Sequence, residues 1–359
     1  MKNLYQRGSE WRKWDLHVHT SSSYNSKYRS NDSDELLVKA WRDNNIAAVA
    51  ITDHFIIDKN RIENLKKIAT DITVFPGVEL RTDKGNTNIH LILIFKNDIN
   101  LKELEEDFNA IMLREKAIAS ESNDTIHWSF DDIIEFGKKR KAIITIHAGS
   151  KSEGIEKITN SIPAAEALKS DVGCKVDMFE IGQIKDIEDY KKNVFQFIDP
   201  KPLIMCSDNH DPRKYSLKEN LWIKADPTFD GLIQCIYQPE ERVFVGNIPI
   251  KLDKSIKNKQ TYIESILVKK VESPKNTVDN WFDFDIPINS GLTTIIGNKG
   301  SGKSALSDII GHFCQSQAIR HASFLHAERF RNSPKNLAND YEGAIRWLDS
   351  QIDDMKTLG

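Results

Sequence analysis

Short apolar runs rich in β-forming residues alternate with amphipathic helical patterns through about residue 245 of this chain. Repeated strand–helix units of this kind are typical of parallel β/α folds. Seven or so repeats favour a closed barrel over an open sheet, so we expect an α/β barrel. The expected strands are residues 13–19, 46–52, 73–80, 88–95, 141–148, 177–182 and 201–207, and the expected helices are residues 33–45, 60–69, 101–121, 129–141 and 186–198. Ser33 and Ser129 are the expected caps of two of these helices.

The character of the sequence changes beyond this region. Residues 247–260, NIPIKLDKSIKNKQ, are polar, contain four lysines and are typical of a connection between domains. A new strand pattern follows in residues 261–274. We therefore place a boundary near residue 255 and expect two domains, residues 1–255 and residues 256–359.

Composition restricts the possible classes of protein. The 359-residue chain has a formal net charge of −3 at pH 7, so any site for a polyanion must be a local patch. Its N-terminus lacks the apolar core of a signal peptide, and no apolar run approaches the ~20 residues of a membrane span. The four cysteines form no C-x-x-C pair, which argues against a zinc ribbon or a disulfide scaffold. We expect a cytoplasmic protein with no membrane partner.

Histidines and acids stand at the ends of the expected strands. His17 and His19 are two residues apart, so their side chains point to the same face of the first strand. The carboxyl ends of parallel strands meet at one mouth of a barrel, where catalytic groups collect. The residues at these ends are His17, His19, Asp53, His54, Glu79, His147, Asp208 and His210.

His90 differs, because it stands at the beginning of its strand. It reaches the same mouth only if that strand runs antiparallel to its neighbours. The short link of residues 81–88 would suit a hairpin between the two strands.

Six histidines, one glutamate and one or two aspartates could therefore converge on one pocket. Imidazole and carboxylate together bind zinc, manganese or iron. Eight ligands exceed what one ion takes, so we expect a bridging carboxylate and two or three ions. Each residue alone could instead be a buried polar group hydrogen-bonded to backbone, but their joint placement favours a metal site.

Residues 12–246 resemble a PHP domain, of the polymerase and histidinol phosphatase family. The resemblance covers H-x-H in DLHVHT, T-D-H in AITDHF, G-V-E in FPGVEL, the histidine of NIHLILIF, H-A-G in ITIHAG and S-D-x-H in CSDNHD. It implies a distorted (βα)7 barrel with three metal ions at the carboxyl ends of its strands. It also implies phosphoesterase activity, on small phosphates or on nucleic acid ends.

The resemblance implies how the ligands divide among the ions. The first ion would be held by His17, His19, Glu79 and Asp208, the second by Glu79, His90 and His147, and the third by His54 and His210. Asn25 stands where family members often add a histidine to the third ion. Asp53 would orient a ligand histidine without binding metal itself.

Ions of this kind activate water as the nucleophile and stabilise charge on phosphoryl oxygens, so no serine or cysteine nucleophile is required. A protein cation is still needed for the remaining phosphate oxygens. Arg213, three residues after His210, is our first candidate, and Lys151 is the second. Each could equally be an ordinary surface charge.

A second motif lies beyond the predicted boundary. Residues 297–304, GNKGSGKS, fit the P-loop pattern G-x-x-x-x-G-K-[ST], between a predicted strand at residues 292–296 and a predicted helix at residues 304–313. Backbone N–H groups of such a loop cradle phosphates, with the lysine on the outer phosphates and the serine hydroxyl on magnesium. The expected residues for ATP with Mg are Gly297, Asn298, Lys299, Gly300, Ser301, Gly302, Lys303 and Ser304.

Residues 284–311 resemble the N-terminal lobe of ABC-type ATPases, close to the SMC-like branch. No Walker B strand or signature loop is recognisable after residue 305, so we do not expect this chain to hydrolyse ATP alone. The resemblance implies dimerisation, because ABC-type sites are completed across two lobes. A PHP domain ahead of an SMC-like ATPase resembles bacterial anti-phage proteins, in which the ATPase would engage nucleic acid and gate a PHP nuclease.

Three functions remain open from the sequence. The leading hypothesis is a metal-dependent phosphoesterase, a nuclease acting on nucleic acid under ATP control. The second is a small-molecule phosphatase of the histidinol-phosphatase type. The third is a non-catalytic, ATP-responsive assembly module with structural metals.

Overall fold

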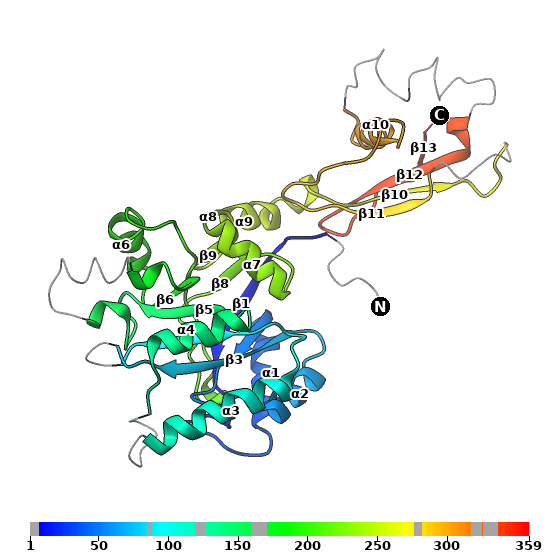
Figure 1. Ribbon diagram of the computed structural model, residues 1–359. Helices are drawn as coiled ribbons and strands as arrows, with labels where there is room; N and C mark the ends of the chain where they lie inside the picture. Colours follow the sequence, from blue (N-terminus) through cyan, green and yellow to red (C-terminus); the bar gives the residue numbers. More distant parts are fainter. Residues whose placement is uncertain are drawn as a thin grey trace. The chain divides into compact units, whose positions relative to one another are not determined.

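The computed structural model describes residues 7–84, 88–118, 126–158, 171–275, 282–316, 325 and 337–358. The chain divides into two compact units, residues 11–249 and residues 250–359 together with residues 1–10 (Figure 1). The domain boundary that the sequence predicts near residue 255 stays a prediction. Residue 255 itself lies inside helix α9 (Ile250–Lys257). None of the described helices is long and apolar enough to cross a membrane.

The larger unit is built on one nine-stranded sheet with the spatial order β7-β6-β5-β4-β3-β2-β1-β8-β9. The strands are β1 (Trp11–Val18), β2 (Ile46–Ile51), β3 (Thr73–Arg81), β4 (His90–Ile94), β5 (Ile143–Ala148), β6 (Met178–Ile181), β7 (Leu203–Ile204), β8 (Leu221–Lys224) and β9 (Val243–Val245). The two edge strands, β7 and β9, lie in contact with one another. The sheet is therefore a nearly closed barrel within a mixed α/β fold, as the alternating sequence pattern predicted.

Strand direction decides which ends meet at the mouth of this barrel. The pairs β1–β2, β2–β3, β5–β6 and β6–β7 are parallel. Strand β4 is antiparallel to both β3 and β5, which confirms the predicted reversal. The start of β4 therefore lies beside the carboxyl ends of its neighbours. The sequence did not reveal β8 and β9, which are short and run antiparallel to their neighbours.

Helices flank the sheet, with α2 packed against β3 and α4 against β5. They are α1 (Ser33–Asp43), α2 (Lys59–Ile68), α3 (Leu101–Ile118), α4 (Phe130–Lys139), α6 (Lys185–Asn193), α7 (Phe229–Tyr237) and α8 (Pro239–Arg242), with short 3-10 turns η1 (Ile155–Ile158) and η2 (Pro212–Lys214). The Ser129 hydroxyl accepts from the Asp132 amide, which confirms that cap. The expected Ser33 cap is wrong, because Asp32 occupies the cap position and makes no side-chain cap bond.

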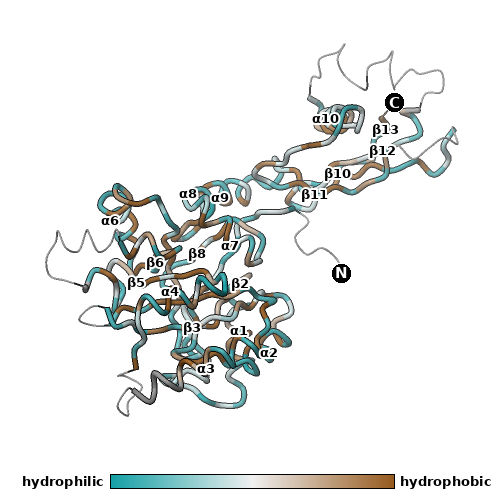
Figure 2. The backbone as a smooth tube through the Cα atoms, viewed as in Figure 1, coloured by the Kyte–Doolittle hydropathy of each residue, from teal (hydrophilic) through white to brown (hydrophobic). Residues whose placement is uncertain are grey.

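The barrel strands are buried on both faces, and their apolar side chains share one core with the flanking helices. Trp14, Leu16, Phe75 and Leu91 are fully buried in it. Figure 2 shows hydrophobic residues along strands such as β5 and β6. A core of this kind holds the strands rigidly, so side chains at their ends are placed with little freedom.

The smaller unit contains a four-stranded antiparallel sheet with the order β11-β10-β12-β13. Its elements are β10 (Ile263–Lys270), β11 (Phe284–Pro287), β12 (Tyr341–Trp347), β13 (Lys356–Thr357), α10 (Lys303–Phe313), η3 (Lys259–Thr261) and η5 (Leu337–Asp340). Ile309 and Phe313 of α10 share one core with Ile266 and Ile345 of the sheet.

The strand predicted at residues 292–296 is wrong for this structure. These residues belong to no strand, and Leu292 and Ile296 are 81% and 84% exposed. The strand before a P-loop is normally stabilised by neighbours on both sides. The described part of the unit offers it no pairing strand, so the apolar segment stays in solvent.

Candidate metal centre

The barrel mouth gathers the histidines and acids that the sequence placed at strand ends. His17, Glu79, His90 and His147 lie on β1, β3, β4 and β5. His19 directly follows β1, and His54, Asp208 and His210 lie in the segments after β2 and β7. Four groups of side chains have donor atoms within 4.8 Å of one another: His17, His19, Glu79 and Asp208; His54, Glu79 and His90; His19, His54 and His210; and His17, His147 and Glu180. Residues far apart in the sequence therefore form one continuous cluster.

The first group surrounds the Nε2 atom of His17. This atom lies 2.9 Å from Glu79 Oε2, 3.0 Å from His19 Nε2 and 3.4 Å from Asp208 Oδ1. His17, His19 and Glu79 are 0–1% exposed. These are the four residues assigned to the first ion by the family resemblance.

Glu79 lies between two sets of histidines. Its Oε2 atom is 3.2 Å from His19 Nε2 and 3.3 Å from His54 Nε2. Its Oε1 atom is 2.6 Å from His90 Nδ1 and 3.5 Å from His147 Nε2. Each carboxylate oxygen thus faces a different set, which is the arrangement of a carboxylate that bridges two ions.

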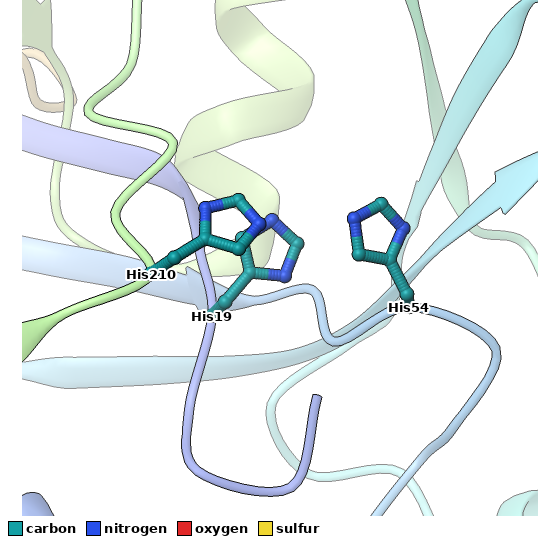
Figure 3. A group of neighbouring side chains, drawn as sticks. All are labelled: His19, His54 and His210. Carbon is teal, nitrogen blue, oxygen red and sulfur yellow. The ribbon is translucent and has the colours of Figure 1, made fainter. Parts of the chain in front are cut away.

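The third group contains His19, His54 and His210. Figure 3 shows the rings of His19 and His210 stacked, with His54 facing them from a separate loop. The ring centroids of His19 and His210 are 4.0 Å apart, and those of His19 and His54 are 4.7 Å apart. Asn25 reaches this group, since its amide Nδ2 donates to His210 Nε2 at 2.8 Å.

Backbone and carboxylate acceptors fix the histidine tautomers. The Nδ1–H of His147 donates to the Ser152 carbonyl at 3.0 Å, and that of His210 donates to the Asp208 carbonyl at 2.9 Å. His147 is then left with an Nε2 lone pair that faces the cluster, whereas the Nε2 lone pair of His210 accepts from the Asn25 amide. The buried Nε2 of His147 has no hydrogen-bond partner among the described residues. It lies 3.5 Å from Glu79 and 3.6 Å from Glu180, so electron pairs face each other without a donor.

Such a donor set fits divalent ions. Lone pairs and carboxylates that converge in a buried space require a cation among them. Imidazole nitrogen with carboxylate oxygen is the ligand chemistry of zinc, manganese and iron. Outer hydrogen bonds that orient ligand imidazoles are a general feature of metal sites.

The electrostatics of the cluster separate its histidines into two classes. Burial lowers the pKa of His54 to about 3, that of His147 to about 3 and that of His210 to about 4. These rings are therefore neutral at neutral pH, and each keeps one nitrogen without a proton. Although burial opposes it, nearby carboxylates, chiefly Glu180, raise the pKa of His17 well above its usual value. The same carboxylates that favour a proton on His17 would favour a cation beside it.

Glu180 is the central residue that sequence reasoning missed. It lies on β6, is fully buried, and its Oε2 atom accepts from His17 Nδ1 at 2.8 Å. Against the cost of burial, His17 and Lys151 lower the pKa of Glu180 to about 2. The available signal was an acid within the apolar run MFEI, where an unpaired charge would be costly.

Two predicted outer residues occupy positions different from those expected. The Asp53 carboxylate accepts from Thr20 N and Thr20 Oγ1, both at 2.6 Å, so it fixes the segment after β1 and bonds none of the described histidines. Lys151 is only 4% exposed, and its Nζ donates to Glu180 at 2.5 Å and to Asp208 at 3.1 Å. The ammonium therefore lies among the ligands rather than on the open side of the site.

Arg213 lies at the surface, on η2. Its side chain is 49% exposed and donates to both Asp211 oxygens, from Nε at 2.9 Å and from an Nη at 2.8 Å. The guanidinium carbon lies 4.3 Å from the centroid of the Tyr28 ring. Asp211 and Tyr28 hold the cation in one orientation while leaving half of it open to solvent.

The P-loop residues, 297–304, lie in the smaller unit and are mostly exposed. Helix α10 begins at Lys303, directly after Gly302, as the motif predicts. The Lys303 Nζ donates to the carbonyls of Gly297 and Asn298 at 2.7 and 2.8 Å. The lysine side chain thus folds over its own loop.

The sequence matches no family model, and no curated protein matches it. Among solved structures it resembles a two-domain protein from Bacteroides vulgatus containing a predicted PHP-like metal-dependent phosphoesterase, at 14% identity and a TM-score of 0.44, covering 75% of this chain and 74% of that chain. It also resembles a candidate metal-dependent phosphoesterase from Bifidobacterium adolescentis, at 14% identity and a TM-score of 0.44, covering 64% and 97%. A third is an amidohydrolase from Chromobacterium violaceum with bound sulfate and no metal, at 13% identity and a TM-score of 0.41, covering 65% and 98%. Identities this low leave the chemistry of this chain to its own side chains.

Proposed function

We propose that residues 11–249 form a metal-dependent phosphoesterase that hydrolyses phosphate esters with water. The observation that carries this proposal is the position of Glu79, whose two oxygens face two different sets of histidines. Divalent ions bound in such a pair of sites activate water and neutralise charge that develops on a phosphoryl group. The resemblance of the sequence motifs to PHP domains supports the same reaction class.

The chain's own residues would divide the work. His17, His19, Glu79 and Asp208 would hold the first ion, and His90 and His147 would complete a second with Glu79. Glu180 holds His17 in the tautomer that presents Nε2 to the ion. His54 and His210 would hold the more open third position beside Asn25.

A metal-dependence assay tests the proposal. Protein stripped with chelator and reloaded with Mn²⁺ or Zn²⁺ should cleave p-nitrophenyl phosphate or bis(p-nitrophenyl) phosphate. Glu79→Gln should lower kcat by about a thousandfold or more, within the acceleration expected of metal-ion catalysis. The matched control is Glu106→Gln, an exposed helical glutamate. Equal cleavage by Glu79→Gln and the parent would overturn the proposal.

Within this class, we propose a nuclease acting on nucleic acid as the first candidate, on the resemblance of the two motif sets to anti-phage proteins. A small-molecule phosphatase is the second candidate. One observation favours it: the most exposed edge of the cluster is Asp208 and His210, with side chains only 27% and 18% exposed. A cluster as buried as this is more accessible to a phosphate at the end of a molecule than to a phosphate inside a nucleic acid duplex. End-labelled DNA and RNA, compared with phosphorylated metabolites, distinguish the two candidates.

We further propose that the smaller unit binds ATP with Mg through residues 297–304, gates the phosphoesterase, and pairs with a second ATPase lobe. The P-loop motif, the start of α10 at Lys303 and the left-handed Gly300 and Gly302 support nucleotide binding. Lys303→Ala should abolish ATP binding in calorimetry. Lys269→Ala, an exposed lysine on β10 of the same unit and outside the loop, is the control. Equal ATP binding by Lys303→Ala and the parent would contradict the proposal.

A further inference from the structure

A lysine lies inside the metal cluster. The Nζ atom of Lys151 is 2.5 Å from Glu180 Oε1 and 3.1 Å from Asp208 Oδ2. The residue is 4% exposed, and Glu180 is 0% exposed. Lys151 therefore joins a carboxylate behind His17 to a carboxylate that faces the first ion position.

The backbone before Lys151 is clamped in place. The Oδ2 atom of Asp186 accepts from Ser150 N at 2.9 Å, Ser150 Oγ at 2.7 Å, Gly182 N at 3.2 Å and Gln183 N at 3.1 Å. One carboxylate oxygen thus ties the turn after β5 to the turn after β6. The first of these turns carries Lys151. The second begins at Gly182, two residues after Glu180.

Glycines make this close approach possible. Gly149 has φ +62°, and a Cβ there would lie 2.6 Å from the Asp186 carboxylate. A Cβ on Gly182 would lie 2.6 Å from the Lys151 amide nitrogen. The turn cannot relax to carry the ammonium out to solvent without breaking these contacts.

The carboxylates around the Lys151 ammonium form a position that would suit a divalent ion. His17, His147 and Glu180 lie at metal-ligand spacing, and Asp208 adds a further carboxylate oxygen beside them. Buried carboxylates need a cation, and two oxygens that converge on one point suit a hard divalent ion. The ammonium already occupies that point, since both oxygens are within hydrogen-bond distance of it.

We propose that Lys151 is a fixed internal cation that takes the place of a further divalent ion between Glu180 and Asp208, and that it does not contact substrate. Lys151 is thus a positioning residue of the metal centre. It neutralises Glu180, which orients His17, and it holds one oxygen of Asp208 so that the other faces the ion. This deepens the proposed function, and it rests on the metal centre of that function rather than on turnover.

Counting bound ions tests this inference. The parent, Lys151→Met, Glu180→Gln and the double variant are saturated with Mn²⁺, and bound ions are counted by native mass spectrometry. Lys151→Met should hold one more Mn²⁺ per chain than the parent and, in chelator, should melt at a lower temperature. In the double variant both differences should disappear, because the carboxylate that needed the cation is gone. Lys191→Met, an exposed lysine paired with Glu188, is the control.

Several outcomes decide against the inference. A folded Lys151→Met that holds the parent number of ions would overturn it. So would a raised KM for p-nitrophenyl phosphate with an unchanged ion count, which would make Lys151 a substrate contact. If Lys151→Met does not fold, a double variant that folds with the parent count supports the inference, and one that also fails overturns it. None of these counts depends on turnover, so an inactive but metal-loaded parent would overturn only the proposed function.

Discussion

The Nδ1 atom of His17 lies 2.8 Å from a carboxylate oxygen of Glu180, and both side chains are completely buried. The contact fixes which ring nitrogen of His17 carries the proton, and so which nitrogen faces Glu79, His19 and Asp208. A carboxylate partner also makes an imidazole a stronger ligand. Glu180 therefore governs the first ion position without contacting it through its own oxygen.

Replacing Glu180 with glutamine should weaken metal binding by about 10–100-fold, the usual effect of losing such a partner. The amide oxygen can still accept from His17, but the negative charge that strengthens the ligand is lost. Competition with a chromogenic chelator measures the change. Glu188→Gln, whose side chain is 82% exposed, should match the parent. An unchanged affinity in Glu180→Gln would contradict this role.

Replacing Asn25 with histidine should tighten the third ion position. The Asn25 amide lies 2.8 Å from His210 Nε2, so an imidazole there can join His54 and His210 as a ligand. Affinity for the most weakly held ion should rise by about tenfold or more, since imidazole is a better zinc ligand than an amide. Zinc titration with a competing dye measures this. If the low-affinity phase of the zinc titration is the same in Asn25→His and the parent, Asn25 is not at an ion position.

Metal binding should release protons at pH 7. Carboxylates raise the pKa of His17 and of His19 above the usual value of 6.5, against the effect of burial. Ions require neutral rings, so protons leave as ions enter, and the apparent affinity should rise with pH from about 6.5 upward. Calorimetry in buffers of different ionisation enthalpy counts the protons. His17→Asn should release fewer protons than the parent. Equal proton release by the two proteins would argue against a protonated His17.

Replacing Arg213 with alanine should raise KM for a phosphomonoester by about tenfold or more while leaving kcat largely unchanged, the loss expected for one charge-assisted hydrogen bond. The guanidinium is half exposed and is oriented by Asp211 and Tyr28. Steady-state kinetics on p-nitrophenyl phosphate measure both constants. An unchanged KM would leave Arg213 as an ordinary surface ion pair.

Replacing Gly149 with alanine should destabilise the larger unit. The left-handed backbone alone costs a non-glycine residue roughly 1–2 kcal/mol, and the new Cβ would also clash with the Asp186 carboxylate. Gly8→Ala provides the matched case, with φ +67° and nothing within 4 Å. Denaturant unfolding, followed separately for each unit, should show the larger loss for Gly149→Ala.

The sequence predicted the parts of this fold that depend on local pattern. Apolar runs gave most strands, and the position of His90 gave the reversal of β4, because only that direction brings it to the mouth. Strand β8 was missed because it pairs with β1 about two hundred residues away and has no strong local signal. The strand expected at residues 292–296 was wrong because pairing, and not propensity, decides whether such a segment forms.

In the candidate site, too, the residues set by local pattern could be predicted and those set by long-range contacts could not. Residues directly at strand ends, such as His54 and His147, were identifiable from the barrel geometry. The burial of Lys151 was not, because it depends on how two neighbouring turns approach each other. Glu180 had one signal, an acid inside an apolar strand, but its pairing with His17 and Lys151 had none. Asp186, which ties those turns together, looked like an ordinary acid at a helix start.

The hairpin of β3 and β4 pairs Arg81 with His90 and Glu79 with Ile92. Side chains alternate along a strand, so a slip of one position would turn His90 away from Glu79 and put Ile89 or Leu91 in its place. An odd-length insertion that shifts this pairing would remove His90 from the metal centre and would also turn the buried Leu91 and Leu93 to the opposite face of the sheet. Loops at the opposite end of the barrel carry no such constraint. We therefore expect related proteins to differ in the lengths of those loops and to keep the length of the link between β3 and β4.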